Sequence, residues 1–150
     1  MPTPDRWMTE AIRLANEARE RGDEPFGALL VADNHSVLEA RNAVNTDGDV
    51  TQHAELRLII KAGRQLSPAV VAGTTLYAST EPCAMCCGAI YWAGIRHLVF
   101  GFPARRLEEM TGGGGIHRSS HQILSDATGD IRIDGPVLEE EAAGPHRGFW

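Results

Sequence analysis

The first stretch of hydrophobic positions has helical spacing. Between residues 3 and 22, apolar side chains recur every three or four positions, which places them on one face of a helix, and Gly22 marks the end of the pattern. The apolar face is formed by Met8, Ala11, Ile12, Ala15 and Ala18. We therefore expect an amphipathic helix that packs on a core through this face.

Short apolar runs predict the strands of a sheet. The predicted strands are residues 27–32, 37–41, 74–79, 97–101 and 131–133. The first two flank Asp33 and Asn34, which are typical of tight turns, so this pair predicts a β-hairpin. The third and fourth are continuously apolar, as buried strands are, and the last is expected at an edge.

Two further helices are predicted between these strands, at residues 53–64 and 82–93. The first has an apolar side, and Gly63 lies near its end. The second has Pro82 at a position that suits the first turn of a helix, and Gly94 follows it. A hairpin followed by alternating helices and strands predicts an α/β fold in which helices cover both faces of a mixed sheet.

Length and charge narrow the class of protein. A chain of 150 residues can bury the core of one domain without disulfides, so we expect residues 1–150 to form a single domain. The formal net charge is −6 and the basic residues form no broad cluster, which disfavours tight binding to a nucleic acid. The three cysteines and the lack of a signal-like or membrane-length apolar run predict a reduced, cytoplasmic protein with no membrane association.

Two short segments contain the residues with the clearest chemistry. His53-Ala54-Glu55 supplies an imidazole and a carboxylate, and Pro82-Cys83-Ala84-Met85-Cys86 supplies two thiols. The two thiols share one face at the start of a helix, where unpaired N–H groups favour thiolates. His53, Cys83 and Cys86 provide three of the four ligands that zinc prefers and leave the fourth position for a reactive water.

Glu55 and Cys87 lie next to these ligands in the sequence. Glu55 is two positions from His53, so the two side chains do not share a helix face, and we expect the carboxylate beside the metal as a general acid and base. Cys87 shares a helix face with Cys83 as well, and Cys86 is preferred because its two-residue gap resembles a known zinc-enzyme signature. A purely structural zinc would lack a fourth ligand and would have no use for Glu55. The sequence therefore favours an enzyme that activates water.

The two segments resemble the signature of the cytidine deaminase-like superfamily of zinc enzymes. Within it, the chain resembles the branch that contains cytosine deaminase, guanine deaminase and tRNA adenosine deaminase. The resemblance runs from Pro25-Phe26-Gly27 through Asn42 and both segments to Gly88-Ala89-Ile90-Tyr91-Trp92-Ala93-Gly94-Ile95 and Gly101. No secure match continues beyond Gly101.

The resemblance implies a three-layer helix–sheet–helix fold with a central mixed five-stranded sheet. It also implies a bound Zn²⁺ whose water attacks the ring carbon that carries an exocyclic amine, so that ammonia leaves. Glu55 would move the proton from water to a ring nitrogen and then to the departing amine. Most relatives are dimers, and the expected partners are a small heterocyclic substrate and a second copy of the chain.

The resemblance also suggests which residues contact the substrate. Asn42 matches the family asparagine that hydrogen-bonds the substrate, with a simple turn residue as the alternative. The backbone near Ala54 and Glu81 would hold the edge of the base. Phe26 and Trp92 would form apolar walls, which suit the faces of a flat ring.

The C-terminal part of the sequence has no secure match to the family. Residues 112–115 are glycines and predict a flexible loop, because no Lys-Ser or Lys-Thr follows as in a phosphate loop. The acidic run 139–141 predicts a solvated face, with substrate binding as the alternative. We expect the tail, about residues 136–150, to cover its own or a neighbouring active site through Phe149 and Trp150, since tryptophan is costly to leave in water.

The signature indicates the reaction better than the substrate. A free aminated nucleobase or a close analogue, such as cytosine, guanine or an aminotriazine, fits a compact, acidic chain. Adenosine in a tRNA loop is the first alternative, and it would require a basic surface around a flipped-out base. A zinc-stabilised module without catalytic activity is the second alternative.

Overall fold

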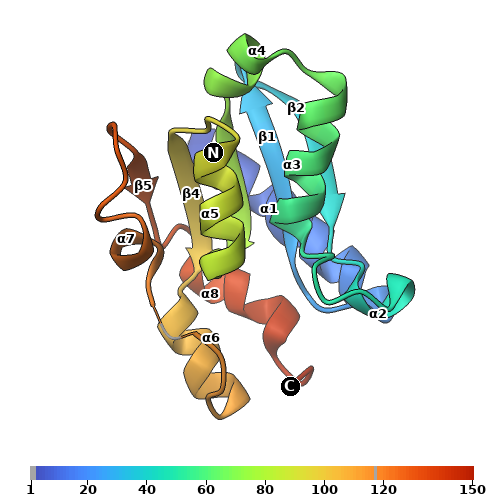
Figure 1. Ribbon diagram of the computed structural model, residues 1–150. Coiled ribbons are helices and arrows are strands. Elements are labelled where there is room, and N and C mark those ends of the chain that lie inside the picture. Colours follow the sequence, from blue (N-terminus) through green and yellow to red (C-terminus); the bar gives the residue numbers. More distant parts are fainter. Residues whose placement is uncertain (1–2, 117) are drawn as a thin grey trace.

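Five strands form a mixed sheet in the computed structural model, which describes residues 3–116 and 118–150 (Figure 1). The strands are β1 (Gly27–Ala32), β2 (His35–Arg41), β3 (Thr75–Thr80), β4 (His97–Phe102) and β5 (Arg132–Asp134). Their order is β2-β1-β3-β4-β5, with β1 antiparallel to both β2 and β3, and with β3, β4 and β5 parallel. The prediction of a mixed five-stranded sheet is confirmed.

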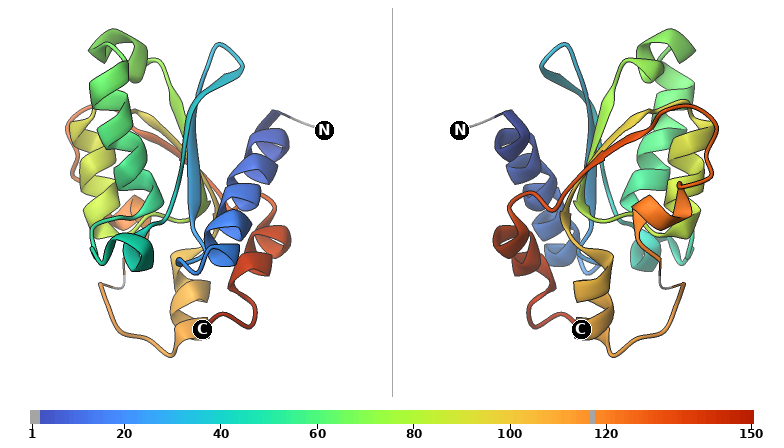
Figure 2. Two further views of the ribbon diagram at one scale, coloured as in Figure 1. Left: turned by 90° about the vertical axis from the view of Figure 1, so that its right-hand side faces the viewer. Right: turned by 90° about the vertical axis from the view of Figure 1, so that its left-hand side faces the viewer.

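Helices cover both faces of this sheet (Figure 2). One face is covered by α3 (Ala54–Gln65) and α5 (Ala84–Trp92), and the other by α1 (Thr3–Glu20) and α8 (Glu139–Ala143). The remaining elements are short: α2 (Val44–Asp47), α4 (Pro68–Ala72), α6 (Ala104–Thr111), α7 (Ser120–Ile123) and the 3₁₀ helix η1 (Gly144–His146). The expected three-layer α/β arrangement is confirmed.

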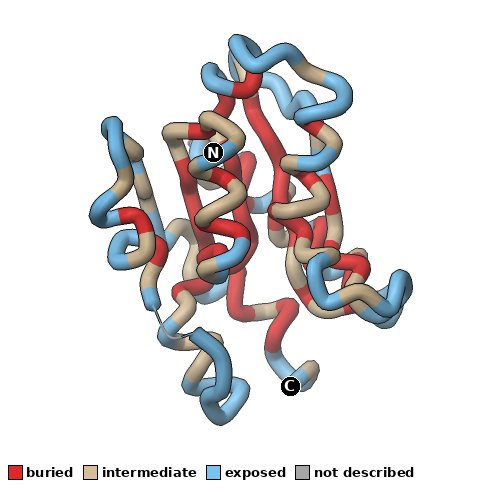
Figure 3. The backbone as a smooth tube through the Cα atoms, viewed as in Figure 1, coloured by how far each residue is buried: buried red, intermediate tan, exposed pale blue. Residues whose placement is uncertain are grey.

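The core consists of two layers, one on each face of the sheet. Leu58 of α3 and Ile90 of α5 pack with Leu76 on one side, and Met8 and Leu14 of α1 pack on the other. Figure 3 shows the buried residues concentrated in the central strands. Each such fully buried side chain contributes about 1.5–3 kcal/mol. The periodic apolar face predicted for the first helix is therefore the face that binds the sheet.

Close packing of α1 on the sheet explains Gly27, the first residue of β1. A Cβ at this position would lie 2.5 Å from both the Ala11 carbonyl oxygen and the Leu14 Cβ. Only glycine fits where the helix backbone approaches the strand so closely. Gly27 thus fixes the start of β1, and with it the position of the neighbouring Phe26.

The predicted hairpin is confirmed. Asp33 and Asn34 have φ values of 49° and 59°, and Ala32 pairs with His35 across the turn. Two successive residues in the left-handed region form the turn whose twist matches that of paired strands.

The acidic run and the glycine loop agree with the sequence expectations, whereas α5 begins later than predicted. The segment 139–141 opens α8, where carboxylates stabilise the partly positive end of a helix, and Glu140 pairs with Arg106 at 2.6 Å and with Arg147 at 3.0 Å. Pro82 precedes Cys83, the N-cap of α5, so it does not occupy the first helical turn as predicted. Residues 112–115 form a loop with positive φ values, in agreement with the sequence.

The described part of the chain contains no helix that is both long enough and apolar enough to cross a membrane.

Candidate active site

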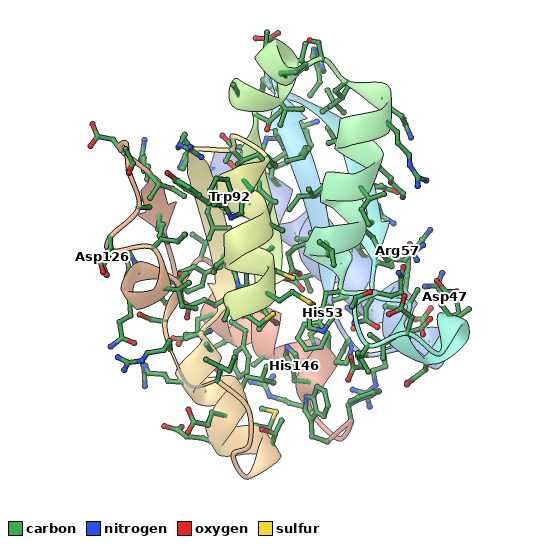
Figure 4. The ribbon with its side chains drawn as sticks, in the orientation of Figure 1. Asp47, His53, Arg57, Trp92, Asp126 and His146 are labelled. Carbon is green, nitrogen blue, oxygen red and sulfur yellow. The ribbon has the colours of Figure 1, made fainter. Side chains whose placement is uncertain are left out.

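Two helix starts meet beside the end of β3. His53 is the N-cap residue of α3, and Cys83 is the N-cap residue of α5, which begins shortly after β3 ends at Thr80. Both halves of the predicted metal-binding signature therefore open a helix, as expected. The loop before each helix brings its ligand to the carboxyl ends of β3 and β4, the edge at which α/β sheets commonly bind ligands (Figure 4).

His53, Cys83 and Cys86 form one group of potential metal ligands. Their ligand atoms all lie within 4.8 Å of one another. Nδ1 of His53 is 3.5 Å from the Cys83 sulfur and 3.7 Å from the Cys86 sulfur. Zinc–nitrogen and zinc–sulfur bonds of about 2.0 and 2.3 Å at a tetrahedral angle place the two ligand atoms about 3.5 Å apart. The donor set therefore fits zinc in both chemistry and spacing.

The charge state of the thiols also suits a metal. The neighbouring Cys86 thiol, followed by the contact with His53, lowers the pKa of Cys83 well below that of a free thiol. The interaction with Cys83, followed by burial, raises the pKa of Cys86. Cys83 is thus a thiolate in this arrangement, and a bound cation would favour ionisation of Cys86 as well.

Cys87 is not part of this group. Its thiol is buried and donates a hydrogen bond to the Pro82 carbonyl at 3.4 Å, and burial raises its pKa to about 12. The expected choice of Cys86 over Cys87 agrees with this geometry.

Glu55 lies beside the ligand group but does not belong to it. The residue is only 5% exposed. Burial, followed by the negative charge of Cys83, raises the pKa of Glu55 to about 7. A carboxyl group with this pKa can both take up and release a proton near neutral pH, which is the requirement for a general acid and base.

A cavity of about 200 Å³ opens next to these residues. Its described lining consists of Glu24, Phe26, His53, Glu55, Thr80, Glu81, Cys83, Leu107 and Trp150. The lining combines two aromatic rings, from Phe26 and Trp150, with three carboxylates. The ring centroids of Phe26 and Trp150 are 6.1 Å apart. This combination can hold a flat ring by its faces and by N–H groups on its edge.

Trp150 reaches the cavity because the tail is anchored along its length. The guanidinium of Arg19 in α1 donates to the carbonyls of Pro145 and Arg147, at 2.9 and 2.6 Å. His146 is 1% exposed and stacks on Phe102. Trp150 then lies at the cavity with its side chain partly exposed. Phe149 contacts Trp150 edge-on and does not belong to the described lining.

Glu81 is held by the protein itself. Its Oε1 accepts the Ala104 N–H at 3.0 Å, and its Oε2 accepts both the N–H and the hydroxyl of Ser120, at 2.7 and 2.5 Å. Its own N–H donates to the Phe102 carbonyl at 2.8 Å. The Glu81 carboxylate therefore fixes α6 and α7 beside the cavity.

A larger cavity, of about 440 Å³, lies beyond Glu81 between α6 and α7. None of the three metal ligands lines it. We therefore place the chemistry in the smaller cavity, where His53, Cys83 and Glu55 converge.

Asn42 and Ala54 lie behind the cavity wall. Asn42 is fully buried, its Nδ2 donates to Glu24 at 3.3 Å, and its Oδ1 accepts the N–H of Val44 at 3.0 Å. The second bond is a turn of the kind considered as the alternative for this residue. Ala54 is the first residue of α3, so its N–H has no partner within the helix, and the residue is fully buried.

Trp92 is the expected wall residue that the structure does not place in the cavity. It ends α5, with 84% of its surface exposed, whereas the ligands lie at the start of the same helix. Figure 4 shows Trp92 and His53 near opposite ends of α5. The expectation of an apolar wall from Trp92 is wrong for this chain, because a helix of nine residues separates it from the site.

Three lining residues were not predicted from the sequence: Glu24, Thr80 and Leu107. Glu24 directly precedes Pro25-Phe26-Gly27, and Thr80 precedes Glu81-Pro82-Cys83, so position next to a recognised motif was the available signal. Leu107 lies beyond Gly101, outside the motifs recognised in the sequence, and had no such signal.

Known proteins resemble this chain in sequence and in fold. A family model, the cytidine and deoxycytidylate deaminase zinc-binding region, matches residues 1–102. A probable cytosine deaminase of Schizosaccharomyces pombe is 43% identical over 96% of this chain and 90% of its own length. A solved structure from a study of A-to-I editing by tRNA:A34 deaminases superposes with a TM-score of 0.74 and 31% identity, covering 93% of this chain and 98% of that one.

Guanine deaminase from Bacillus subtilis has the same fold, with a TM-score of 0.63 and 29% identity over 95% of this chain and 90% of that one. The relatives thus share the reaction and differ in the molecule that loses its amine. Together with the zinc ligand group and Glu55, these matches exclude the non-catalytic alternative. The chain belongs to the cytidine and deoxycytidylate deaminase zinc-binding family and is a zinc-dependent hydrolytic deaminase that acts on a C–N bond.

Proposed function

We propose that this chain deaminates a free aminated nucleobase or a close heterocyclic analogue, such as cytosine, guanine or an aminotriazine. The charge of the cavity wall carries this proposal. Among the described lining residues, three are glutamates and none is a lysine or an arginine. A ring with several N–H donors suits this wall, whereas carboxylates repel a phosphate group.

The size of the cavity supports a small substrate. Pockets for drug-sized ligands usually measure about 300–1,000 Å³, and this one measures about 200 Å³. Phe26 and Trp150 offer ring faces on which a flat heterocycle can stack. Covering of this cavity by the tail is part of the proposal, and Trp150 is the residue that would close it.

The reaction replaces the exocyclic amine by the oxygen of water and releases ammonia. His53, Cys83 and Cys86 would hold the zinc ion, which would supply the Lewis acid needed to activate water near neutral pH. Glu55 takes a proton from the attacking water, passes it to a ring nitrogen, and then helps to protonate the departing amine. Its buried position keeps this proton from exchanging freely with solvent.

The direct test measures ammonia released from a panel of bases, nucleosides and aminotriazines by zinc-loaded protein. We expect turnover of at least one free base, at a kcat/KM well above that of the matching nucleoside. Glu55→Ala serves as the inactive control. The absence of ammonia from every free base and triazine would reject the proposal.

Adenosine in tRNA is the second candidate, and the 31% identity to the structure from the tRNA:A34 deaminase study favours it. Binding to tRNA would require neutralisation of backbone phosphates, so affinity should fall steeply with salt. Inosine formation in tRNA combined with such a salt dependence would favour this candidate over a free base. The acidic cavity wall and the net charge of −6 disfavour it.

We also propose that the chain forms a homodimer through the exposed face of α5. Trp92 is 84% exposed and Met85 is 39% exposed on this helix. Large aromatic side chains at the surface are typical of the centres of protein interfaces. Light scattering should give twice the chain mass, and Trp92→Glu should shift it toward the monomer. The three free thiols fit a reducing compartment such as the cytoplasm.

A further inference from the structure

Glu24 is the lining carboxylate whose role the deaminase chemistry leaves open. It lies between α1 and β1, is half-buried, and faces the same cavity as Phe26 and Trp150. Glu55 is engaged in proton transfer, and Glu81 already accepts three hydrogen bonds from Ala104 and Ser120. Glu24 is therefore the carboxylate on this wall that remains available to a substrate.

One oxygen of Glu24 is held and the other is free. Nδ2 of Asn42 donates to Oε1 of Glu24 at 3.3 Å. Among the described residues, no group donates a hydrogen bond to Oε2. A carboxylate at neutral pH can only accept hydrogen bonds, and it has room for several of them. A substrate group that binds Oε2 of Glu24 must therefore be an N–H or O–H donor.

Asn42 gives Glu24 a fixed position. Its side-chain oxygen accepts the Val44 N–H, its backbone N–H donates to the Phe26 carbonyl at 3.0 Å, and its carbonyl accepts the Arg21 guanidinium at 2.8 Å. A buried amide with this many partners cannot move without breaking several bonds. Asn42 is thus a positioning residue for Glu24 in this structure.

The structures of the bases then indicate which of their N–H groups can donate to Glu24. The amine that leaves and the ring nitrogen next to it must face Glu55 and the metal ligands. In cytosine, the remaining N–H is the one on the nitrogen that bears the sugar in a nucleoside. In guanine, the N–H group farthest from the reacting carbon is on the five-membered ring, which carries the sugar in guanosine. This N–H exists in the free base and is absent from the nucleoside.

We propose that Glu24 is a specificity-determining residue that accepts this N–H and so selects free bases over nucleosides. The inference rests on the proposed function and extends it, since it names the atom by which the substrate class is recognised. Replacement of the N–H by an N–sugar or N–methyl bond removes the donor and leaves the carboxylate unpaired against an apolar group. Sites built around one hydrogen bond reject analogues that lack it.

The experiment compares each base with its N-methyl analogue, 1-methylcytosine for cytosine and 9-methylguanine for guanine. A methyl group removes the donor but adds far less bulk than a sugar. For the wild-type protein, we expect kcat/KM to be about ten to a hundred times higher for the parent base, as for a hydrogen bond to a charged group. Equal kcat/KM for the two would overturn the proposal without any variant.

Variants assign this preference to Glu24. Glu24→Gln should lose part of the preference and Glu24→Ala most of it, mainly through slower turnover of the parent base. Glu20→Gln makes the same change of charge on an exposed residue of α1 and should keep the full preference. Zinc content and thermal unfolding, measured for every variant, identify any loss that comes from folding.

The outcomes separate the two proposals. If neither cytosine, guanine nor a triazine releases ammonia, the proposed function itself fails. If a base is deaminated, but Glu24→Ala lowers kcat/KM for the parent base and its N-methyl analogue by the same factor, the role of Glu24 fails and the function stands. A preference that disappears in Glu24→Ala and survives in Glu20→Gln supports both.

Discussion

The indole N–H of Trp150 donates a hydrogen bond to Nδ1 of His146 at 3.0 Å. An indole nitrogen can only donate, so Nδ1 must be unprotonated, and the proton of the neutral imidazole is on Nε2. Nε2 lies 2.7 Å from the Thr80 hydroxyl and donates to it. One imidazole in a fixed tautomer therefore connects the tail to the end of β3, and both ends of this chain of bonds line the cavity.

Substitutions of Trp150 distinguish the contribution of its aromatic ring from that of its indole N–H. We expect Trp150→Phe to raise KM by a small factor, because a ring remains, and Trp150→Ala to raise it about tenfold or more, because the wall is lost. In Trp150→Ala the free energy of unfolding should fall by only about 1 kcal/mol, since 46% of the Trp150 surface is exposed. Steady-state kinetics and urea unfolding measure the two effects.

Phe149→Ala is the control for this test, because its side chain lies next to Trp150 outside the described lining. It should change KM less than Trp150→Ala does. An unchanged KM in Trp150→Ala would show that the tail does not cover the substrate.

His146 should make stability depend on pH. Burial, followed by the positive charge of Arg19, lowers the pKa of His146 to about 4, from 6.5. Below pH 6.5 His146 becomes protonated in the unfolded chain but stays neutral in the folded chain. Its contribution to the free energy of unfolding is therefore complete above pH 6.5 and decreases as the pH falls toward 4. Between pH 7 and pH 5 this residue should cost about 2 kcal/mol of the free energy of unfolding.

His146→Gln can form both hydrogen bonds without titrating, so its stability should decrease less over this range. Denaturant unfolding at pH 7 and pH 5 measures the difference, with His35→Gln as an exposed control. Parallel decreases in wild type and His146→Gln would contradict the assignment.

The sequence predicted those parts of the site that depend on local rules. His53 and Cys83 were expected at helix starts because the residues that follow them have helical spacing, and both are N-cap residues. The hairpin followed from Asp33 and Asn34, whose short polar side chains tolerate positive φ. Such features are set by neighbours in the sequence, so they can be recognised without the fold.

The substrate wall depends on contacts between distant segments, and there the sequence was less informative. Trp92 was assigned to the cavity from its place within a family motif, yet the direction of α5 carries it to the far end. Glu24 and Leu107 reach the cavity from segments more than 80 residues apart in the sequence. Leu107 is held there by packing with Phe102 and α8 and by the bond from Ala104 to Glu81, contacts between segments that no local pattern encodes.

The two neighbouring cysteines offer a matched test of the metal site. Cys86→Ser should lower the zinc content well below one ion per chain and abolish activity, because a hydroxyl is a poor replacement for a thiolate. Cys87→Ser should keep its zinc, because its side chain contacts the Pro82 carbonyl and not the ligand group. Metal analysis after dialysis measures both. Loss of zinc from Cys87→Ser alone would reverse the ligand assignment.

Glu55→Gln tests the separation between holding the metal and moving the proton. Glutamine preserves the shape of the side chain but cannot take up a proton, so kcat should fall about 10²- to 10⁴-fold. The zinc content should stay at one ion per chain, since Glu55 lies outside the ligand group. Stability should stay equal or rise, because a buried carboxylate that must lose its hydration is replaced by a neutral amide. Loss of zinc together with activity would instead make Glu55 a ligand.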